Sequence, residues 1–442
     1  MSDESRTAGP GSKAGQEGGD EEHQQTDEER MIEEIVKQKE LIDALPSGDT
    51  ARGVVRRALY QRKLGQLEFQ YQILLEKKRL PRELSKFEEM YGVVHSEPCL
   101  ICLEDIHIHA SGDLVEVFNC CGGFICKACV RNLHETKMGL SQCPLCREPF
   151  TANDASKRAA QVMALAQRGV SWAQAGLGNN MINGTRGLKK QEKAGLEWLN
   201  KAVAQNYPLA LYELSHLYRN GLASVLRKSQ ENANKLLLQS ANLGHSASNF
   251  TLAKFHMLGT DGFEKNIDEA YFRASVSYAL DDTNENTALT LGYMHCNECL
   301  PEPSPYLACY YANMAASTDT TTGAACYLYV DALSRLVRHL HDGYTPNGSN
   351  VLPAMIFWWR KSRDLGNNDA VDKLEKIESI GQISCGNCSK KAEAGEKFKQ
   401  CSKCKAQWYC SKECQVEAWR AGHKKDCKRA RILKFEDYIN SE

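Results

Sequence analysis

Cysteine is the residue whose type and spacing carry the clearest chemistry in this sequence. Of the 19 cysteines, eight lie between Cys99 and Cys146 and seven lie between Cys385 and Cys427. In both segments pairs of cysteines separated by two residues recur, which is the spacing of tetrahedral metal ligands. The N-terminal residues contain no long apolar run, so we expect a reducing compartment, the cytoplasm or the nucleus. Clustered cysteines in such a compartment favour zinc binding over disulfides.

The C-terminal segment contains eight soft ligands with the spacing Cys-x2-Cys-x12-Cys-x2-Cys-x5-Cys-x3-Cys-x8-His-x3-Cys. Eight ligands satisfy two tetrahedral zinc ions and leave no open position, which is typical of structural sites. The segment is rich in lysine and poor in apolar residues, so it cannot build a core by itself. Zinc binding, worth roughly 10–16 kcal/mol per ion in small peptides, can replace that core.

This spacing, together with the run YCSKECQVEAWRAGHKKDC, resembles the MYND finger. The resemblance implies two interleaved zinc sites, the first formed by Cys385, Cys388, Cys410 and Cys414 and the second by Cys401, Cys404, His423 and Cys427. It also implies a groove for short proline-containing peptides, formed in part by Gln415 and Trp419. Some MYND proteins are lysine methyltransferases, but their Asn-His-x-Cys motif is absent from this sequence. The resemblance therefore implies protein docking.

The N-terminal cysteine segment has the pattern CxxC, CC, CxxC, CxxC. Two short strands, LVEVF and GFIC, are predicted around the adjacent cysteines, and a helix, KACVRNLHETK, is predicted after them. This arrangement resembles a RING finger. The cross-brace of that family implies one zinc site formed by Cys99, Cys102, Cys126 and Cys129, and another formed by Cys120, Cys121, Cys143 and Cys146.

One position departs from the common RING pattern. Most RING fingers have a histidine two residues after the third ligand, and here that position is Gly123. All-cysteine variants of the family offer a precedent for two ligands at Cys120 and Cys121. The alternative is that one of these cysteines ligates together with a nearby histidine: His107, His109 or His134.

RING ubiquitin ligases need no catalytic side chain, because they hold a ubiquitin-conjugating enzyme in a reactive geometry. The family contacts that enzyme through an apolar residue in the first CxxC, here Ile101, and a proline in the last one, here Pro144. A basic residue after the last ligand, here Arg147, often hydrogen bonds to ubiquitin. All three positions match, so the segment is predicted to be active. The alternative is a purely structural zinc module.

Between the cysteine segments the sequence repeats itself. Leucines recur at steps of 37, 38 and 39 residues, and glycines recur at steps of 37 and 38. The leucines are Leu177, Leu214, Leu252 and Leu291, and the glycines are Gly184, Gly221 and Gly259. Each unit has two predicted helices, with small residues such as Ala210 and Ser248 where the helices approach closely. The pattern resembles the Sel1-like repeat, a relative of the tetratricopeptide unit, and implies an α-solenoid with a protein-binding concave face. The alternative is a helical bundle with accidental periodicity. Cys296 and Cys299 are either core thiols, which we favour, or half of a metal site.

The remaining segments are predicted from composition. Residues 1–30 are acidic and lack large apolar side chains, so disorder is expected. Residues 31–91 are helical and basic, with a break expected at Pro81, and residues 428–442 form a basic amphipathic tail. We interpret the basic residues as a solvated helix face, although a nucleic-acid surface is the alternative. No stretch approaches the ~20 apolar residues of a membrane span.

We therefore predict a multi-domain, mainly α-helical protein. An α-solenoid over residues 156–380 is flanked by a RING-like finger at 95–150 and a MYND-type finger at 385–427, with about four zinc ions per chain, two per finger. The function that fits best is an adaptor-type RING ubiquitin ligase, whose partners are a ubiquitin-conjugating enzyme and protein substrates or proline-containing peptides. The alternative is a non-enzymatic scaffold. Because solenoid repeats contact mainly their neighbours, loss of a C-terminal ligand such as Cys404 is expected to unfold that end alone.

Overall fold

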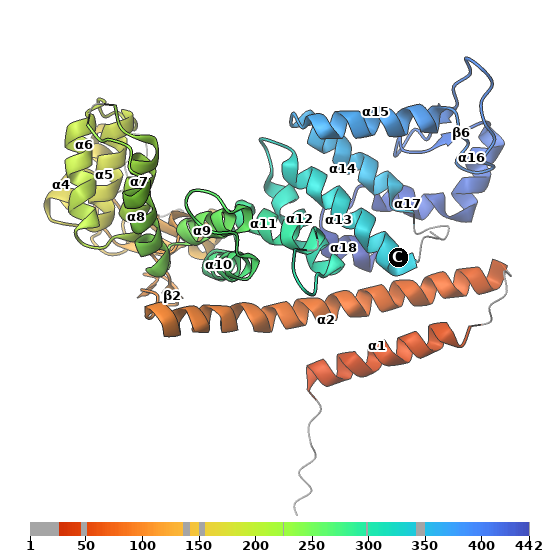
Figure 1. The fold of residues 1–442 in the computed structure, drawn as a ribbon, viewed down its shortest axis with the longest axis horizontal. Helices are drawn as coiled ribbons and strands as arrows, with labels where there is room; N and C mark the ends of the chain where they lie inside the picture. Colours follow the sequence, from red (N-terminus) through yellow and green to blue (C-terminus); the bar gives the residue numbers. More distant parts are fainter. Residues whose placement is uncertain are drawn as a thin grey trace, which may run out of the picture.

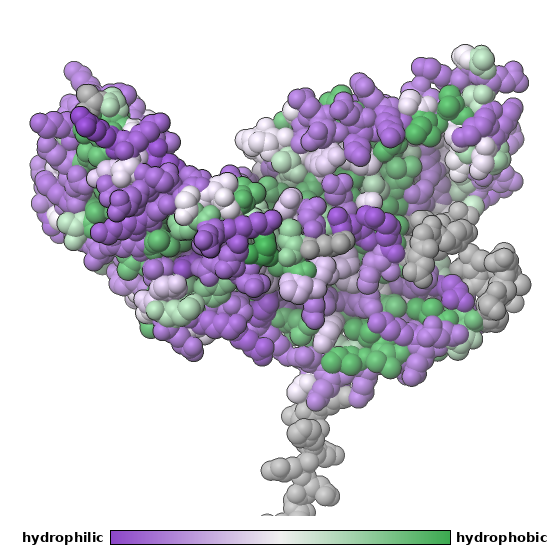
Figure 2. Space-filling model, viewed as in Figure 1, coloured by the Kyte–Doolittle hydropathy of each residue, from purple (hydrophilic) through white to green (hydrophobic). Residues whose placement is uncertain are grey.

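A curved row of antiparallel helices forms the body of the protein, and the long helix α2 runs along one side of it (Figure 1). The structure is a computed structural model that describes residues 26–45, 51–135, 142–149, 155–223, 225–297, 299–341 and 350–441. The N-terminal cysteine module lies beside the first helices of the row, and the C-terminal module lies beside the last ones. A saddle separates the two ends of the row on the face shown in Figure 2.

The row contains the repeat helices predicted from the sequence. In chain order they are α4 (Ala155–Gln167), α5 (Ser171–Asn183), α6 (Glu192–Val203), α7 (Pro208–Asn220), α8 (Gln230–Asn242), α9 (Ser246–Leu258), α10 (Ile267–Leu280), α11 (Glu285–Cys296), α12 (Pro305–Thr318), α13 (Ala324–His341), α14 (Leu352–Asp364) and α15 (Asn368–Gln382).

Polar caps and glycines set the ends of these helices. The side chains of Ser229 and Asn266 accept hydrogen bonds from backbone N–H groups three residues later, which begins α8 and α10. Gly184 and Gly259 end α5 and α9 in the left-handed conformation, with φ of 68° and 67°. These turns are the glycine-marked turns that the repeat pattern predicts.

The repeat leucines form the interior of the solenoid. Leu177, Leu214, Leu252 and Leu291 are all buried, as are the small residues at the helix contacts. The prediction of a mainly helical solenoid between two cysteine-rich modules is therefore confirmed, because each helix packs chiefly on its sequence neighbours. Cys296 is a buried core thiol, and Cys299 belongs to none of the metal-ligand groups found among the described residues.

Two helices precede the modules: α1 (Asp27–Asp43) and α2 (Ala51–Tyr91). Residues 1–25 lie outside the described residues, but the prediction of disorder for residues 27–30 is wrong. Thr26 and Glu29 form a capping box, in which each side chain accepts a hydrogen bond from the other's backbone N–H. This cap begins α1 before the predicted start at Met31.

The predicted break at Pro81 is also wrong, because α2 continues through this residue. Packing on both sides of the proline holds the helix together despite the missing hydrogen bond. Before it, Arg79 donates to Ser275 of α10 at 2.8 Å. After it, Phe87 is fully buried with Val276 of the same helix. Pro81 itself is exposed to solvent.

Helix α2 is tied to several repeats along its length. Arg79 donates to both carboxylate oxygens of Glu76 at 2.6 and 2.7 Å, and the Tyr311 hydroxyl of α12 donates to the same carboxylate. Nearer the N-terminal end of α2, the Tyr306 hydroxyl donates to Glu68 at 2.8 Å. At the C-terminal end of α2, Arg273 of α10 donates to the Tyr91 hydroxyl at 2.8 Å. These contacts join α2 to both α10 and α12.

The C-terminal residues return to the solenoid core. They form α16 (Lys412–Ala418), a π-helical turn (Trp419–His423), α17 (Lys424–Arg429) and α18 (Phe435–Asn440). Phe435 is fully buried and its ring packs against Phe69 of α2 at 5.1 Å between centroids. The Asn313 side chain accepts from the Phe435 N–H and donates to the Leu433 carbonyl, both at 2.8 Å. The predicted amphipathic tail therefore completes the core.

Short antiparallel strand pairs occur in the cysteine modules. They are β1 (Glu97–Pro98) with β2 (Asp105–Ile106), β3 (Val115–Val117) with β4 (Phe124–Cys126), and β5 (Lys399–Gln400) with β6 (Trp408–Tyr409). A 3-10 turn (Gly112–Leu114) precedes β3, and α3 (Lys127–Glu135) follows β4. Among the described helices, none is both long enough and apolar enough to span a membrane.

Candidate metal centres

The structure brings the clustered cysteines together as four groups of four ligands. In each group the ligand atoms lie within 4.8 Å of one another. The N-terminal module contains Cys99, Cys102, Cys126 and Cys129, and then Cys120, Cys121, Cys143 and Cys146. The C-terminal module contains Cys385, Cys388, Cys410 and Cys414, and then Cys401, Cys404, His423 and Cys427. In both modules the first and third ligand pairs form one group, and the second and fourth form the other.

The sulfur separations fit tetrahedral zinc. Within the groups they are 3.9 Å for Cys99–Cys129, 3.8 Å for Cys102–Cys126, 3.5 Å for Cys121–Cys143 and 3.6 Å for Cys388–Cys410. A zinc–sulfur bond of about 2.3 Å gives a tetrahedron edge of about 3.8 Å. A disulfide would need about 2.05 Å, and all these cysteines are free. The donor sets, four sulfurs or three sulfurs and an imidazole, are those of closed zinc sites.

Tight backbone turns follow four of the five CxxC pairs, while the fifth, Cys126-x2-Cys129, leads into α3. The residue after the second cysteine of these four pairs has a positive φ: Leu103 (62°), Arg147 (63°), Ser389 (59°) and Lys405 (52°). Its N–H donates to the carbonyl of the first cysteine at 2.9–3.0 Å, as from Leu103 to Cys99. The turn directs other backbone N–H groups at the sulfur of the first cysteine. The Cys99 sulfur accepts from the N–H groups of Ile101 at 3.5 Å and Cys126 at 3.3 Å.

These N–H groups favour the thiolate. Burial opposes ionisation of Cys99 and Cys385, but the backbone hydrogen bonds outweigh it and lower the pKa of each to about 6. Burial and the neighbouring thiols instead raise the pKa of Cys129 to about 12. One thiol of a group thus ionises readily while its neighbours resist, because negative charges would be crowded together. A divalent cation removes that conflict, so the residues fit zinc.

His423 is the one nitrogen ligand in the four groups. Its Nε2 lies 3.6 Å from the Cys404 sulfur, so Nε2 is the atom that would bind a metal. Burial lowers the pKa of His423, which favours the neutral imidazole that metals require. The Tyr409 and Trp419 rings pack edge-on against the imidazole, both at 5.9 Å between centroids.

Gly123 occupies the position where most RING fingers have a histidine, and two leucine side chains lie close to it. A Cβ at this position would lie 2.8 Å from the end of the Leu100 side chain and 3.3 Å from that of Leu145, so a larger residue would require these side chains to move. His107 and His109 belong to none of the four groups, and the His134 side chain lies outside the described residues. His109 instead stacks on His95 at 4.6 Å between centroids, and burial lowers its pKa to about 4.

The predicted contact residues of the N-terminal module lie at its surface. Ile101 is 41% exposed, Arg147 is exposed and Pro144 is half-buried. Sequence reasoning missed two further apolar side chains on the same turns, Leu103 at 74% and Leu145 at 56% exposed. The sequence could have indicated these two residues, because each lies inside or directly after a CxxC pair.

Gln415 and Trp419, the predicted peptide-binding pair, are one helical turn apart at the end of α16. Both side chains are half-buried, so part of each faces solvent. The Lys403 ammonium lies 5.2 Å from the Trp419 ring centroid. Trp419 therefore presents a partly exposed aromatic surface beside Gln415 and the Lys403 ammonium.

The C-terminal module is packed tightly on the solenoid. Arg360 of α14 donates to the carbonyl of Lys405 at 2.8 Å and to that of Cys404 at 3.4 Å. Arg360 also pairs with Glu378 of α15 at 2.7 Å. Cys385, Cys401 and Trp408 of this module belong to the same buried cluster as Trp358 of α14. No local sequence pattern marks Arg360, because two of its partners are backbone carbonyls 44 and 45 residues away.

Comparison with protein families identifies two of these parts. The MYND finger model matches residues 385–427, and the Sel1 repeat model matches residues 173–207 and 208–245. The chain therefore contains a MYND finger and Sel1 repeats. The N-terminal module contains two four-cysteine groups.

Two curated proteins are similar to this chain over short stretches. The chain is 32% identical over 84 residues to chitin synthase regulator SKT5 of Malassezia restricta, which covers 18% of this chain and 6% of that protein. It is 45% identical over 49 residues to a SET and MYND domain-containing protein of Dictyostelium discoideum, which covers 10% of this chain and 9% of that protein. The chain thus matches less than a tenth of the length of each of these relatives.

Two solved structures are similar at low identity. A Sel1 repeat protein from Oxalobacter formigenes is 19% identical with a TM-score of 0.42, covering 58% of this chain and 88% of that one. A protective antigen of uropathogenic Escherichia coli, described as displaying an SLR fold, is 16% identical with a TM-score of 0.43, covering 78% of this chain and 67% of that one.

Elemental analysis of the purified full-length protein should give about four zinc ions per chain, because each closed group of four ligands holds one ion. The Cys388→Ser variant should lose about one ion. Cys299→Ser removes a half-buried thiol outside the groups and should keep all four. A count of two or fewer in the unaltered protein would show that one module binds no metal.

Loss of zinc from the second MYND site should destabilise helices outside the finger, contrary to the sequence-based expectation of local unfolding. The Cys404→Ser variant should raise backbone hydrogen exchange in α14, α15 and α18, because these helices share a buried cluster with the finger. The thermal midpoint of the whole chain should also fall. Faster exchange confined to residues 385–427, with Cys299→Ser as the reference, would contradict the shared core.

Proposed function

We propose that this chain is an adaptor-type ubiquitin ligase of the cytoplasm or nucleus. In this proposal the N-terminal module is a RING finger that recruits a ubiquitin-conjugating enzyme, and the Sel1 repeats and MYND finger hold protein partners. The observation that carries it is the interleaved pair of four-cysteine groups with Ile101, Pro144 and Arg147 on its surface turns. Such a finger acts by positioning two other molecules and needs no nucleophile of its own.

The surface of the N-terminal module supports docking. Ile101, Leu103 and Leu145 hold apolar side chains in water on turns whose backbone is fixed by the metal ligands. Exposed apolar groups that gather on a rigid surface are typical of protein-binding sites. Arg147 lies on the last of these turns, where a guanidinium can donate charge-assisted hydrogen bonds to a bound protein.

A non-enzymatic scaffold is the second candidate function. The observation that favours it is Gly123, which stands where most RING fingers have a histidine ligand. In that case the N-terminal module would contribute a folded, zinc-stabilised surface, and the partners would be assembled without ubiquitin transfer.

For the MYND finger we propose binding of short proline-containing peptides along Gln415 and Trp419. The Trp419 ring offers a flat apolar wall, and the Gln415 amide can bond to the backbone of an extended peptide. Proline lowers the ordering cost of such a peptide, because its φ is already restricted. This function supplies the partner side of the adaptor.

The full-length protein should stimulate ubiquitin chain formation, including its own modification, with at least one ubiquitin-conjugating enzyme. Ile101→Ala should weaken this activity by removing an apolar contact. Arg147→Ala should remove a charge-assisted hydrogen bond worth about 1.5–3 kcal/mol, which slows transfer roughly 10- to 100-fold if the bond forms only in the activated complex. Both variants should keep their zinc, because neither residue is a ligand.

The matched control for this experiment is Arg186→Ala. Arg186 is also an exposed arginine with a positive φ, of 51°, but it lies in the turn after α5 and outside the N-terminal module. Its loss should leave transfer unchanged. If fully metallated protein is inactive with a broad panel of conjugating enzymes, the ligase proposal is wrong and the scaffold stands.

A fluorescent proline-containing peptide should bind the full-length protein, and Trp419→Ala should weaken this binding at least about 10-fold, because the peptide loses its aromatic wall. Trp198→Ala is the control, since Trp198 is also half-buried and faces a lysine, Lys201, at 3.9 Å. Calorimetry and zinc analysis should be run on each variant. Equal affinity of the Trp419→Ala variant and the unaltered protein would exclude the proposed groove.

A further inference from the structure

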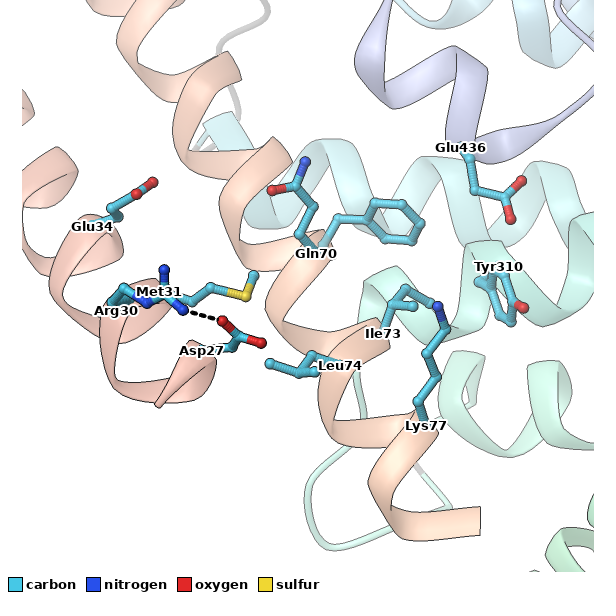
Figure 3. Close-up of a pocket in the computed structure, with 11 residues that line it drawn as sticks. Asp27, Arg30, Met31, Glu34, Gln70, Ile73, Leu74, Lys77, Tyr310 and Glu436 are labelled. Atoms are coloured by element: carbon cyan, nitrogen blue, oxygen red, sulfur yellow. Dashed lines mark hydrogen bonds and ion pairs between the residues drawn. The ribbon is translucent and has the colours of Figure 1, made fainter. Parts of the chain in front are cut away.

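A groove beside α2 is separate from both cysteine modules (Figure 3). Its volume is about 600 Å³. One face of α2 forms the floor, with Gln70, Ile73, Leu74 and Lys77 at helical spacing. Helix α1 forms one wall, and Tyr310 of α12 with Glu436 of α18 forms the other.

The groove has an apolar interior and carboxylates on both walls, with one cation, Lys77, on its floor. Met31, Ile73 and Leu74 are half-exposed in it, so apolar surface remains in contact with water. Asp27 is paired with Arg30, whereas Glu34 and Glu436 are exposed and form no ion pair within the described part of the chain. Burial, followed by the nearby Glu436 carboxylate, raises the pKa of Tyr310. A complementary occupant is a helix with an apolar side chain between two cations.

The first turns of α2 have this composition. Arg56, Leu59 and Lys63 are all exposed and share one face of the helix at spacings of three and four residues. Leu59 is 53% exposed. Arg56 and Lys63 form no ion pair among the described residues. Within its own chain this face is too far along α2 to reach the groove, since 14 residues of helix separate Leu59 from Ile73 by about 21 Å.

We propose that the groove receives the first turns of α2 from a second copy of the chain, in a two-fold symmetric dimer. Leu59, Gln66 and Ile73 follow one another at intervals of seven residues, so they lie along one side of α2. When two α2 helices pair antiparallel, Leu59 of each chain lies opposite Ile73 of the other, and the two-fold axis passes beside Gln66, whose amide donates to the Ile439 carbonyl of its own chain at 3.2 Å. The same contact is then made twice, as a two-fold interface requires.

The charges of α1 and α2 fit this arrangement. Helix α1 has seven acidic and three basic residues, whereas residues 51–86 have ten basic and three acidic ones. Antiparallel pairing brings Arg56 and Lys63 of one chain to the acidic walls of the other, which contain Glu34 and Glu436. Apolar side chains also gather at the surface over α1 in Figure 2.

Sedimentation equilibrium of the full-length, zinc-loaded protein tests this dimer. The unaltered protein should sediment at twice the chain mass at low salt, and dissociation should increase with salt because the walls and the occupant attract each other electrostatically. Leu59→Glu should raise the dimer dissociation constant at least about 100-fold, because it places a carboxylate in each of the two acidic grooves. Circular dichroism and zinc content should stay unchanged, since Leu59 is exposed in the single chain.

Two further variants make the test specific. Leu41→Glu alters another exposed leucine, 42% exposed, on α1; this residue does not line the groove, so the variant should leave the dimer intact. Lys63→Glu should weaken the dimer, and the double variant Lys63→Glu, Glu34→Lys should recover part of the lost affinity. A chain that stays monomeric at all concentrations would overturn the proposal, as would equal effects of Leu59→Glu and Leu41→Glu.

Discussion

The buried ion pair of Glu76 and Arg79 determines how the long helix α2 lies on the repeats. Both residues belong to α2, yet their remaining hydrogen bonds go to Tyr311 of α12 and Ser275 of α10. Burial alone would raise the pKa of Glu76, but Arg79 holds it below its usual value, so the carboxylate stays charged. Removing one partner of a buried ion pair costs roughly 3–5 kcal/mol, because the other is left as an uncompensated charge. One register of α2 on the repeats is thereby favoured over the others.

Helix α2 couples repeats that would otherwise unfold independently. In a simple repeat array each unit contacts only its neighbours, and local unfolding stays local. Here α2 contacts α10, α12, α13 and α18, and it meets the C-terminal residues again where Gln66 donates to the Ile439 carbonyl at 3.2 Å. Chain segments 373 residues apart are therefore joined in one core. The MYND finger lies on the same core, so its metal sites and the last repeats support one another.

Two zinc modules with the same interleaved ligand order thus sit at different places on one frame. The N-terminal module is anchored where the end of α2 meets α10: Val94 and Ala110 pack with Phe87, and the Ser246 N–H donates to the Ala110 carbonyl at 2.9 Å. The two modules lie beside opposite ends of the row of helices (Figure 1). Both modules are therefore packed on one frame, formed by α2 and the repeats.

The sequence by itself determined the features that depend on neighbouring residues. The ligand spacing, the repeat period and the glycine turns of the solenoid are local, because a CxxC turn or a helix end is decided within a few residues.

The tertiary structure decided the features in which contacts between distant residues compete with local preference. Helix α2 continues through Pro81 because Arg79 and Phe87 are held by α10. Gly123 lies beside the side chains of Leu100 and Leu145, which only the folded module brings close to it. The final residues, polar in sequence, enter the core because Phe435 has partners in α2 and α12. Such contacts depend on chain segments that meet only after folding, so no local pattern predicts them.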